Sequence, residues 1–267
     1  MASESVITSS NRIDERFRVL RETHRKALVC YATAGHPDRA RSLDLLLGLQ
    51  DAGADVIEVG VPFSDPLADG PVIQASSQTA LDGGMTFDGA LALVKEAGLE
   101  IPVVLFGYLN PFLAAGSNCL ERIAAAGCDG VLITDLPVGS DPVLEARFTD
   151  SPLAFVRLVA PTTPTDRMKL IASNGSGFVY LISRLGVTGM QSEVASDLNA
   201  TVERLRSATT LPVCVGFGVT DARQAATVAR IADGVIVGSA IVKAAETSVA
   251  SAVALARALR AGIDNAA

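Results

Sequence analysis

The sequence predicts an α/β protein that forms a single (β/α)8 TIM barrel with an extra N-terminal helix. The chain has 267 residues, and barrels of roughly 250 residues form one unit. Its residues are 49% hydrophobic but only 4% aromatic, with 23 Gly and no Trp, a composition typical of buried parallel strands that alternate with helices. Eight short apolar runs alternate with helical patterns, and eight strands close such a barrel.

The predicted strands recur with helical patterns between them, at residues 27–33, 55–61, 102–107, 129–134, 153–158, 177–183, 212–216 and 233–238. Three segments share one plan of helix end, small-residue turn with Asp, and apolar run: AGADVIEVG (52–60), AAGCDGVLITD (125–135) and ARIADGVIVGS (229–239). Such repetition indicates βα units that feed a parallel sheet. An open doubly wound sheet is the alternative, but the turn after the first strand reads TAGHPD instead of GxGxxG.

The N-terminal region predicts one further helix. The stretch RIDERFRVLRETHR is amphipathic, with Ile13, Phe17 and Leu20 on one face, and we expect it to cover the bottom of the barrel. Residues 1–10 are expected to be a disordered tail. Since no linker or change of composition follows, residues 11–267 are predicted to form one catalytic domain.

Charge and composition exclude several classes of partner. The formal net charge is -7 and no Lys/Arg-rich run occurs, which argues against nucleic acid and anionic membranes. The four cysteines lack metal-ligand or CxxC spacing, so we expect buried reduced thiols. No apolar run approaches the ~18 residues of a membrane span, and the N-terminus lacks the features of a signal peptide. We therefore expect a cytoplasmic protein.

The stretch EVGVPFSDPLADGP (58–71) places a carboxylate inside a predicted strand. Period-2 alternation directs Glu58 into the barrel, where the other two repeats carry Leu132 and Ile236. Burial raises the pKa of a lone carboxyl group toward the range that suits proton transfer. The alternative is a structural Glu paired with a neighbouring hydroxyl or Arg.

Two more carboxylates follow in the loop. Asp65 precedes Pro66, which favours a turn or an interface role. Asp69 could cap the helix that Pro71 begins, or it could face Glu58 across a substrate. Two carboxyl groups in unlike surroundings are what opposed acid and base roles require.

Two late segments predict a phosphate site. GFGVTDARQ (216–224) and VGSAIVK (237–243) each deliver Gly at a strand end before a helix, so the backbone N–H groups of Gly218, Gly238 and Ser239 are the candidate donors. These glycines could instead serve tight turns alone. The segment SRLGVTGMQSEVASD, with Gly186 and Gly189, is a candidate lid over residues 184–195, and a disordered loop is its alternative.

Several catalytic chemistries are disfavoured. The two histidines, His24 and His36, are too few for a multi-His zinc site, and neither GxSxG nor a Cys paired with a plausible His occurs. None of the lysines is placed at a strand end, where an imine-forming amine would lie: they are Lys26, Lys95, Lys169 and Lys243. We therefore expect acid/base chemistry on a phosphorylated substrate without metal or cofactor.

From about Asn11 onward the sequence resembles the tryptophan synthase alpha chain family. The motifs EVGVPFSDPLADGPVIQ (58–74), YLISRLGVTG (180–189), VGFGVT (215–220) and GSAIVK (238–243) occur in the family's order. The resemblance implies a (β/α)8 barrel that cleaves indole-3-glycerol phosphate by a retro-aldol reaction into indole and glyceraldehyde 3-phosphate.

The resemblance also implies roles for residues. Glu58 would protonate C3 of the indole and then take the proton of the side-chain hydroxyl, and Asp69 would accept the indole N–H. Tyr180 would line the site, and Thr188 would meet Asp69 when the lid closes. The remaining positions would form apolar wall (Tyr31, Phe106 and Tyr108) or hold the indole and phosphate ends (Gly189, Phe217, Gly218, Gly238 and Ser239).

The family's partner is a pyridoxal-phosphate-bearing beta chain that receives indole through a tunnel, so the resemblance implies an α2β2 heterotetramer. This chain departs from the family pattern at Val29-Cys30, at His36 and at Val138-Gly139-Ser140, where a Glu-Glu pair is usual. None of these departures touches the proton-transfer pair, although the last changes the partner-facing surface. A stand-alone lyase and a non-catalytic phosphate-binding barrel are the alternative functions.

Overall fold

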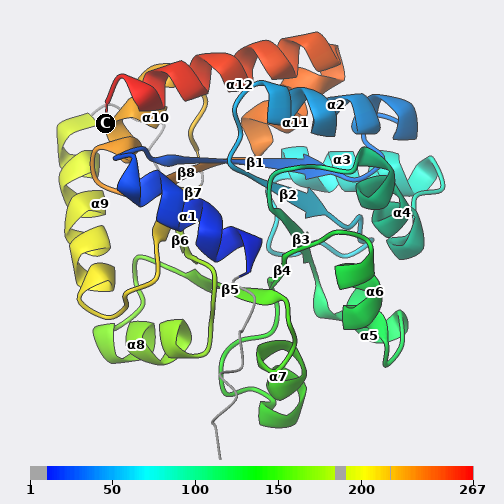
Figure 1. The fold of residues 1–267 in the computed structure, drawn as a ribbon, viewed down its shortest axis with the longest axis horizontal. Helices are drawn as coiled ribbons and strands as arrows, with labels where there is room; N and C mark the ends of the chain where they lie inside the picture. Colours follow the sequence, from blue (N-terminus) through cyan, green and yellow to red (C-terminus); the bar gives the residue numbers. More distant parts are fainter. Residues whose placement is uncertain (1–10, 184–190, 217, 267) are drawn as a thin grey trace, which may run out of the picture.

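Eight parallel strands form a closed barrel in chain order (Figure 1). The computed structural model describes residues 11–183, 191–216 and 218–266. The strands are β1 (Ala27–Thr33), β2 (Val56–Gly60), β3 (Val103–Gly107), β4 (Gly130–Ile133), β5 (Ala154–Val159), β6 (Val179–Ile182), β7 (Val213–Gly216) and β8 (Gly234–Val237). Since β8 pairs with β1, the predicted barrel is confirmed and the open sheet is excluded.

Helices follow every strand and surround the barrel. They are α1 (Arg12–Glu22), α2 (Arg39–Asp51), α3 (Pro71–Asp82), α4 (Phe87–Ala97), α5 (Leu109–Ala114), α6 (Cys119–Ala125), α7 (Pro142–Thr149), α8 (Thr165–Ser173), α9 (Gln191–Arg206), α10 (Ala222–Ala229), α11 (Ser239–Thr247) and α12 (Val249–Asp264). Two helices follow β2, β3 and β8. None of the described helices combines the length and the hydropathy of a membrane-spanning segment.

The N-terminal helix covers the bottom of the barrel, as predicted. Ile13, Phe17 and Leu20 are the buried residues of α1. They join one apolar cluster with the inward side chains of the strands, among them Leu132 and Ile236. Figure 1 shows α1 lying across one end of the barrel. The other end is left open for a site.

The outward side chains of the strands pack against the helices in a second, larger apolar cluster. The four cysteines are free and buried, as expected. They are divided between the two apolar clusters: Cys214 lies in the interior cluster and the other three lie in the outer one.

The Asp of each sequence repeat has a common structural role. Its carboxylate accepts the N–H of a residue in the preceding strand of the barrel, at distances of 2.7–2.9 Å. The three contacts are Leu28 N–H to Asp55, Val103 N–H to Asp129, and Val213 N–H to Asp233. The repeated turn therefore satisfies a backbone donor at the bottom of the neighbouring strand.

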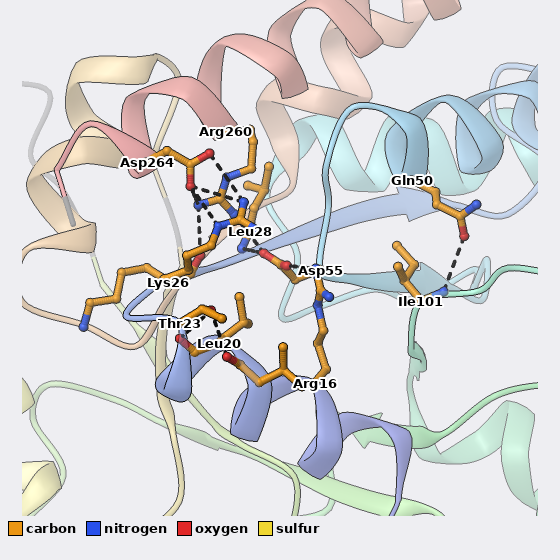
Figure 2. Close-up of polar contacts among 12 residues, drawn as sticks. Arg16, Leu20, Thr23, Lys26, Leu28, Gln50, Asp55, Ile101, Arg260 and Asp264 are labelled. Atoms are coloured by element: carbon orange, nitrogen blue, oxygen red, sulfur yellow. Dashed lines mark hydrogen bonds and ion pairs between the residues drawn. The ribbon is translucent and has the colours of Figure 1, made fainter.

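Asp55 is also the centre of an ion-pair network that joins both ends of the chain (Figure 2). Its fully buried carboxylate pairs with Arg16 of α1 and, at 2.8 Å, with Arg260 of α12. Arg260 in turn pairs with Asp264 at 2.7 Å. A buried carboxylate requires such partners, and here they fasten the first and last helices to the barrel.

Candidate active site

A cavity of about 160 Å³ opens where the strands end. Its lining comes from six strands, β1, β2, β3, β5, β6 and β8, and from the segments that follow β2, β4, β7 and β8. The lining residues are Tyr31, Glu58, Ala68, Asp69, Gly70, Ile73, Phe106, Thr134, Leu158, Tyr180, Ile182, Gly218, Val219, Thr220, Ile236, Gly238, Ser239 and Ala240. This end of a barrel is where active sites of the fold lie.

Glu58 points into the barrel, as predicted from the alternation of β2. Its side chain is 1% exposed, and its Oε1 has no hydrogen-bond partner among the described residues. Burial raises the pKa of this carboxyl group from 4.5 to about 8. The alternative of a structural Glu paired with a hydroxyl or Arg therefore has no support, and Glu58 is a neutral acid at pH 7.

Asp69 reaches the same cavity from the loop after β2. It does not cap α3, since the N-cap residue is Gly70 and no side chain caps that helix. Instead, the Tyr108 hydroxyl donates to Asp69 Oδ2 at 3.1 Å. Partial burial raises the pKa of Asp69 from 3.8 to about 6, and the Tyr108 hydrogen bond opposes this rise.

The two carboxyl groups are thus held in opposite states. Near pH 7 Glu58 carries its proton because apolar walls surround it, whereas Asp69 is ionised because it keeps a donor and some exposure to water. One group can give a proton in the same cavity where the other can stabilise positive charge. Asp65, by contrast, is exposed and lies in the turn, where it accepts from Ser64 at 2.5 Å.

Two inward tyrosines shape the walls. Tyr31 of β1 lies over Gly60 of β2, and Tyr180 of β6 lies over Gly216 of β7 in the same way. A Cβ atom on either glycine would overlap the tyrosine hydroxyl. Each Tyr therefore requires a glycine on the following strand. Phe106 packs edge-on against Tyr31, with ring centroids 5.3 Å apart.

Backbone lines the side of the cavity where phosphate binding was predicted. Gly218 has φ +89, a conformation that favours glycine, and Gly238 is the N-cap of α11. Ser239 begins that helix and also lines the cavity. A helix N-terminus and free N–H groups suit an anion. No Lys or Arg occurs among the described lining residues.

One predicted contact residue lies behind the cavity lining, and others lie beyond what the structure describes. Tyr108 was expected to form apolar wall, but it does not line the cavity; its hydroxyl holds Asp69. Thr188, Gly189 and Phe217 lie outside the described residues, as do most of the candidate lid (184–190) and the N-terminal tail (1–10).

The sequence reasoning missed much of the wall. Leu158 and Ile182 line the cavity from β5 and β6, and the alternation of those strands could have identified them. Ile73 comes from α3 and Thr134 follows β4. No local pattern identifies these two, because they reach the cavity only when distant segments meet.

Comparison with known proteins places this site in a family. Residues 17–265 match the family model described as tryptophan synthase alpha chain. A tryptophan synthase alpha chain of Caulobacter vibrioides is 46% identical over 245 residues, which cover 90% of this chain and 89% of that protein. One from Desulfatibacillum aliphaticivorans is 48% identical over 234 residues, covering 85% and 87%.

Solved structures support membership of the same family. Tryptophan synthase subunit alpha from Legionella pneumophila superposes with a TM-score of 0.88 at 35% identity, covering 96% of this chain and 100% of that one. A chain of tryptophan synthase from M. tuberculosis, in its aminoacrylate-bound form, gives 0.85 at 34% identity, covering 95% and 100%. This chain therefore belongs to the tryptophan synthase alpha chain family.

Proposed function

We propose that this protein is the alpha subunit of a tryptophan synthase and cleaves indole-3-glycerol phosphate into indole and glyceraldehyde 3-phosphate. The observation that carries this proposal is the pair of carboxyl groups in one cavity, with the pKa of Glu58 near 8 and that of Asp69 near 6. A retro-aldol cleavage of this substrate needs one protonated acid and one anion, which this pair supplies at neutral pH.

The proposed reaction uses the protonation states of these two carboxyl groups. Glu58 gives its proton to C3 of the indole ring, so the ring becomes an iminium that can accept electrons. Asp69 accepts a hydrogen bond from the indole N–H and stabilises the positive charge. The Glu58 carboxylate then takes the proton of the hydroxyl on the adjacent side-chain carbon. The C–C bond breaks, its electrons return to the ring, and Glu58 is protonated again.

The rest of the cavity would position the substrate. The apolar side chains of Tyr31, Phe106 and Tyr180 suit the indole ring. Backbone N–H groups at Gly218, Gly238 and Ser239 would hold the phosphate, which explains how a cavity without described basic side chains could bind a dianion. By resemblance, Thr188, Gly189 and Phe217 would complete the site.

We also propose that the chain works with a beta chain in an α2β2 assembly. The M. tuberculosis neighbour is a chain of tryptophan synthase, and the product indole is small and apolar enough to escape without a receiving subunit. The cytoplasm is the proposed compartment, since all four cysteines are buried free thiols and such thiols persist in a reducing environment.

The experiment measures indole release from indole-3-glycerol phosphate by the purified chain, alone and with a beta chain. We expect slow release alone and a strong increase with the partner. High turnover alone that is unchanged on mixing would indicate a stand-alone lyase. Binding without cleavage in both conditions would indicate a non-catalytic barrel.

Two variants test the assigned roles. Glu58→Gln and Asp69→Asn should each lose at least about 100-fold in turnover, while binding of inorganic phosphate survives. Near-parental turnover in either variant would refute the role of that residue.

A further inference from the structure

Asp135 ends the second sequence repeat, and its carboxylate contacts the next loop of the barrel mouth. Its Oδ1 accepts the N–H of Leu109 at 2.7 Å. Leu109 is the first residue of α5, whose N-cap residue, Tyr108, makes no side-chain capping hydrogen bond. Asp135 therefore supplies from outside the acceptor that the start of this short helix lacks.

The residue next to this contact is the one that holds Asp69. Tyr108 is 5% exposed. Its hydroxyl accepts the N–H of Ala68 at 2.9 Å and donates to Asp69 Oδ2 at 3.1 Å. Its ring packs against Phe63, with centroids 5.1 Å apart. No other described side chain donates to the Asp69 carboxylate, so the orientation of Asp69 depends on where the backbone places Tyr108.

We infer that Asp135 is a positioning residue for the reaction, acting on Asp69 through the start of α5 and the Tyr108 hydroxyl. The inference rests on the proposed function and adds a residue to it. The contacts join the ends of three successive strands, from β4 through β3 to the loop after β2. Thr134 strengthens the first junction, because its N–H donates to the Gly107 carbonyl at 3.0 Å and the residue lines the cavity.

The physical consequence concerns turnover more than substrate affinity. Asp69 is needed in a defined place when the indole ring becomes cationic, and small misplacements of such a group reduce the rate. The proposed phosphate contacts at Gly218, Gly238 and Ser239 lie on other loops. Loosening the start of α5 should therefore lower kcat and leave KM nearly unchanged.

The test compares Asp135→Ala with Asp135→Asn in the full-length chain. We expect Asp135→Ala to lower kcat about fivefold, the size of effect that a lost helix cap can produce, with KM within about twofold of the parent. Asp135→Asn should retain most of kcat, because the amide oxygen can still accept from Leu109. Asp135→Gln, whose longer side chain displaces the acceptor, replaces the alanine variant if that variant folds poorly.

Asp141→Ala is the matched control. Asp141 is also exposed and caps α7 by accepting the N–H of Leu144 at 2.9 Å. Among the described residues, no hydrogen bond joins it to Tyr108 or Asp69. Its kcat should equal that of the parent. An equal loss of kcat in this variant would mean that weakening any helix cap at the mouth has the same effect, which would overturn the inference.

A double-mutant cycle with Tyr108→Phe decides whether Asp135 acts through Tyr108. Once the hydroxyl is gone, Asp135→Ala should lower kcat no further. Additive losses, or parental kcat in Asp135→Ala, would overturn the inference. If the parent chain releases no indole, the proposed function fails instead, so the two failures are distinguishable.

Discussion

Glu58→Gln should inactivate the protein and stabilise it at the same time. The amide is close in size and polarity to the protonated carboxyl group, but it cannot ionise. In the unfolded chain Glu58 releases its proton near pH 4.5, whereas in the folded protein it keeps the proton until about pH 8. Between these values the folded state binds the extra proton, so this residue lowers stability as pH rises from 4.5 to 8.

The magnitude follows from the same two pKa values. Each unit of pH above 4.5 costs about 1.4 kcal/mol until the folded-state pKa is approached. At pH 7 the cost is about 3 kcal/mol, and below pH 4.5 it approaches zero. Glu58→Gln removes it, so the variant should gain about 3 kcal/mol over the parent at pH 7 and almost nothing at pH 4.5.

Urea unfolding of both proteins, followed by circular dichroism between pH 4.5 and 8, measures this gain. Glu100→Gln is the control for the substitution itself, because Glu100 is exposed, and its difference from the parent at each pH is subtracted from that of Glu58→Gln. If the midpoints of Glu58→Gln and the parent differ by a constant amount at every pH, Glu58 is not held as a neutral acid and the proposed proton donor is refuted.

Three further predictions follow from the geometry. Cleavage, measured as kcat/KM between pH 5 and 9, should be greatest near pH 7 because it needs protonated Glu58 and ionised Asp69. The fall above pH 8 is the decisive part of the profile, since a substrate phosphate itself titrates near pH 6. Undiminished activity at pH 9 would contradict the assignment. Asp55→Ala should lower the free energy of unfolding by about 3–5 kcal/mol, because it leaves two guanidinium groups without their buried partner. A loss under about 1 kcal/mol in urea unfolding would show that water replaces the carboxylate. Gly216→Ala should abolish substrate binding while the chain still folds, because the new Cβ displaces the Tyr180 hydroxyl into the cavity; calorimetric titration with substrate checks this, and parental affinity would contradict it.

Most of the fold could be predicted because its signals are local. Alternation within a strand determines which side chains share a face, so the inward direction of Glu58 followed from β2 alone. The apolar spacing of α1 identified the face formed by Ile13, Phe17 and Leu20 in the same way. The ends of β1 matched the prediction, and most other strand ends differed by one or two residues, as at β6, which begins at Val179 after Gly177 with φ +77. Strand ends depend on neighbouring strands, which no local pattern specifies.

The candidate site likewise combines features that local sequence predicts with features that depend on distant segments. The run from residue 58 to 71 by itself determined that two carboxyl groups lie close to the barrel mouth, because a rigid loop directly follows an inward-facing strand position. Only the tertiary structure decided what surrounds them: burial among distant segments encloses Glu58, and Tyr108 donates to Asp69 across 39 residues of chain. Periodicity gives the direction of a side chain but not its partner. The protonation state of Glu58 depends on its burial, and that of Asp69 on burial and the Tyr108 hydrogen bond, so both emerge only when the barrel closes.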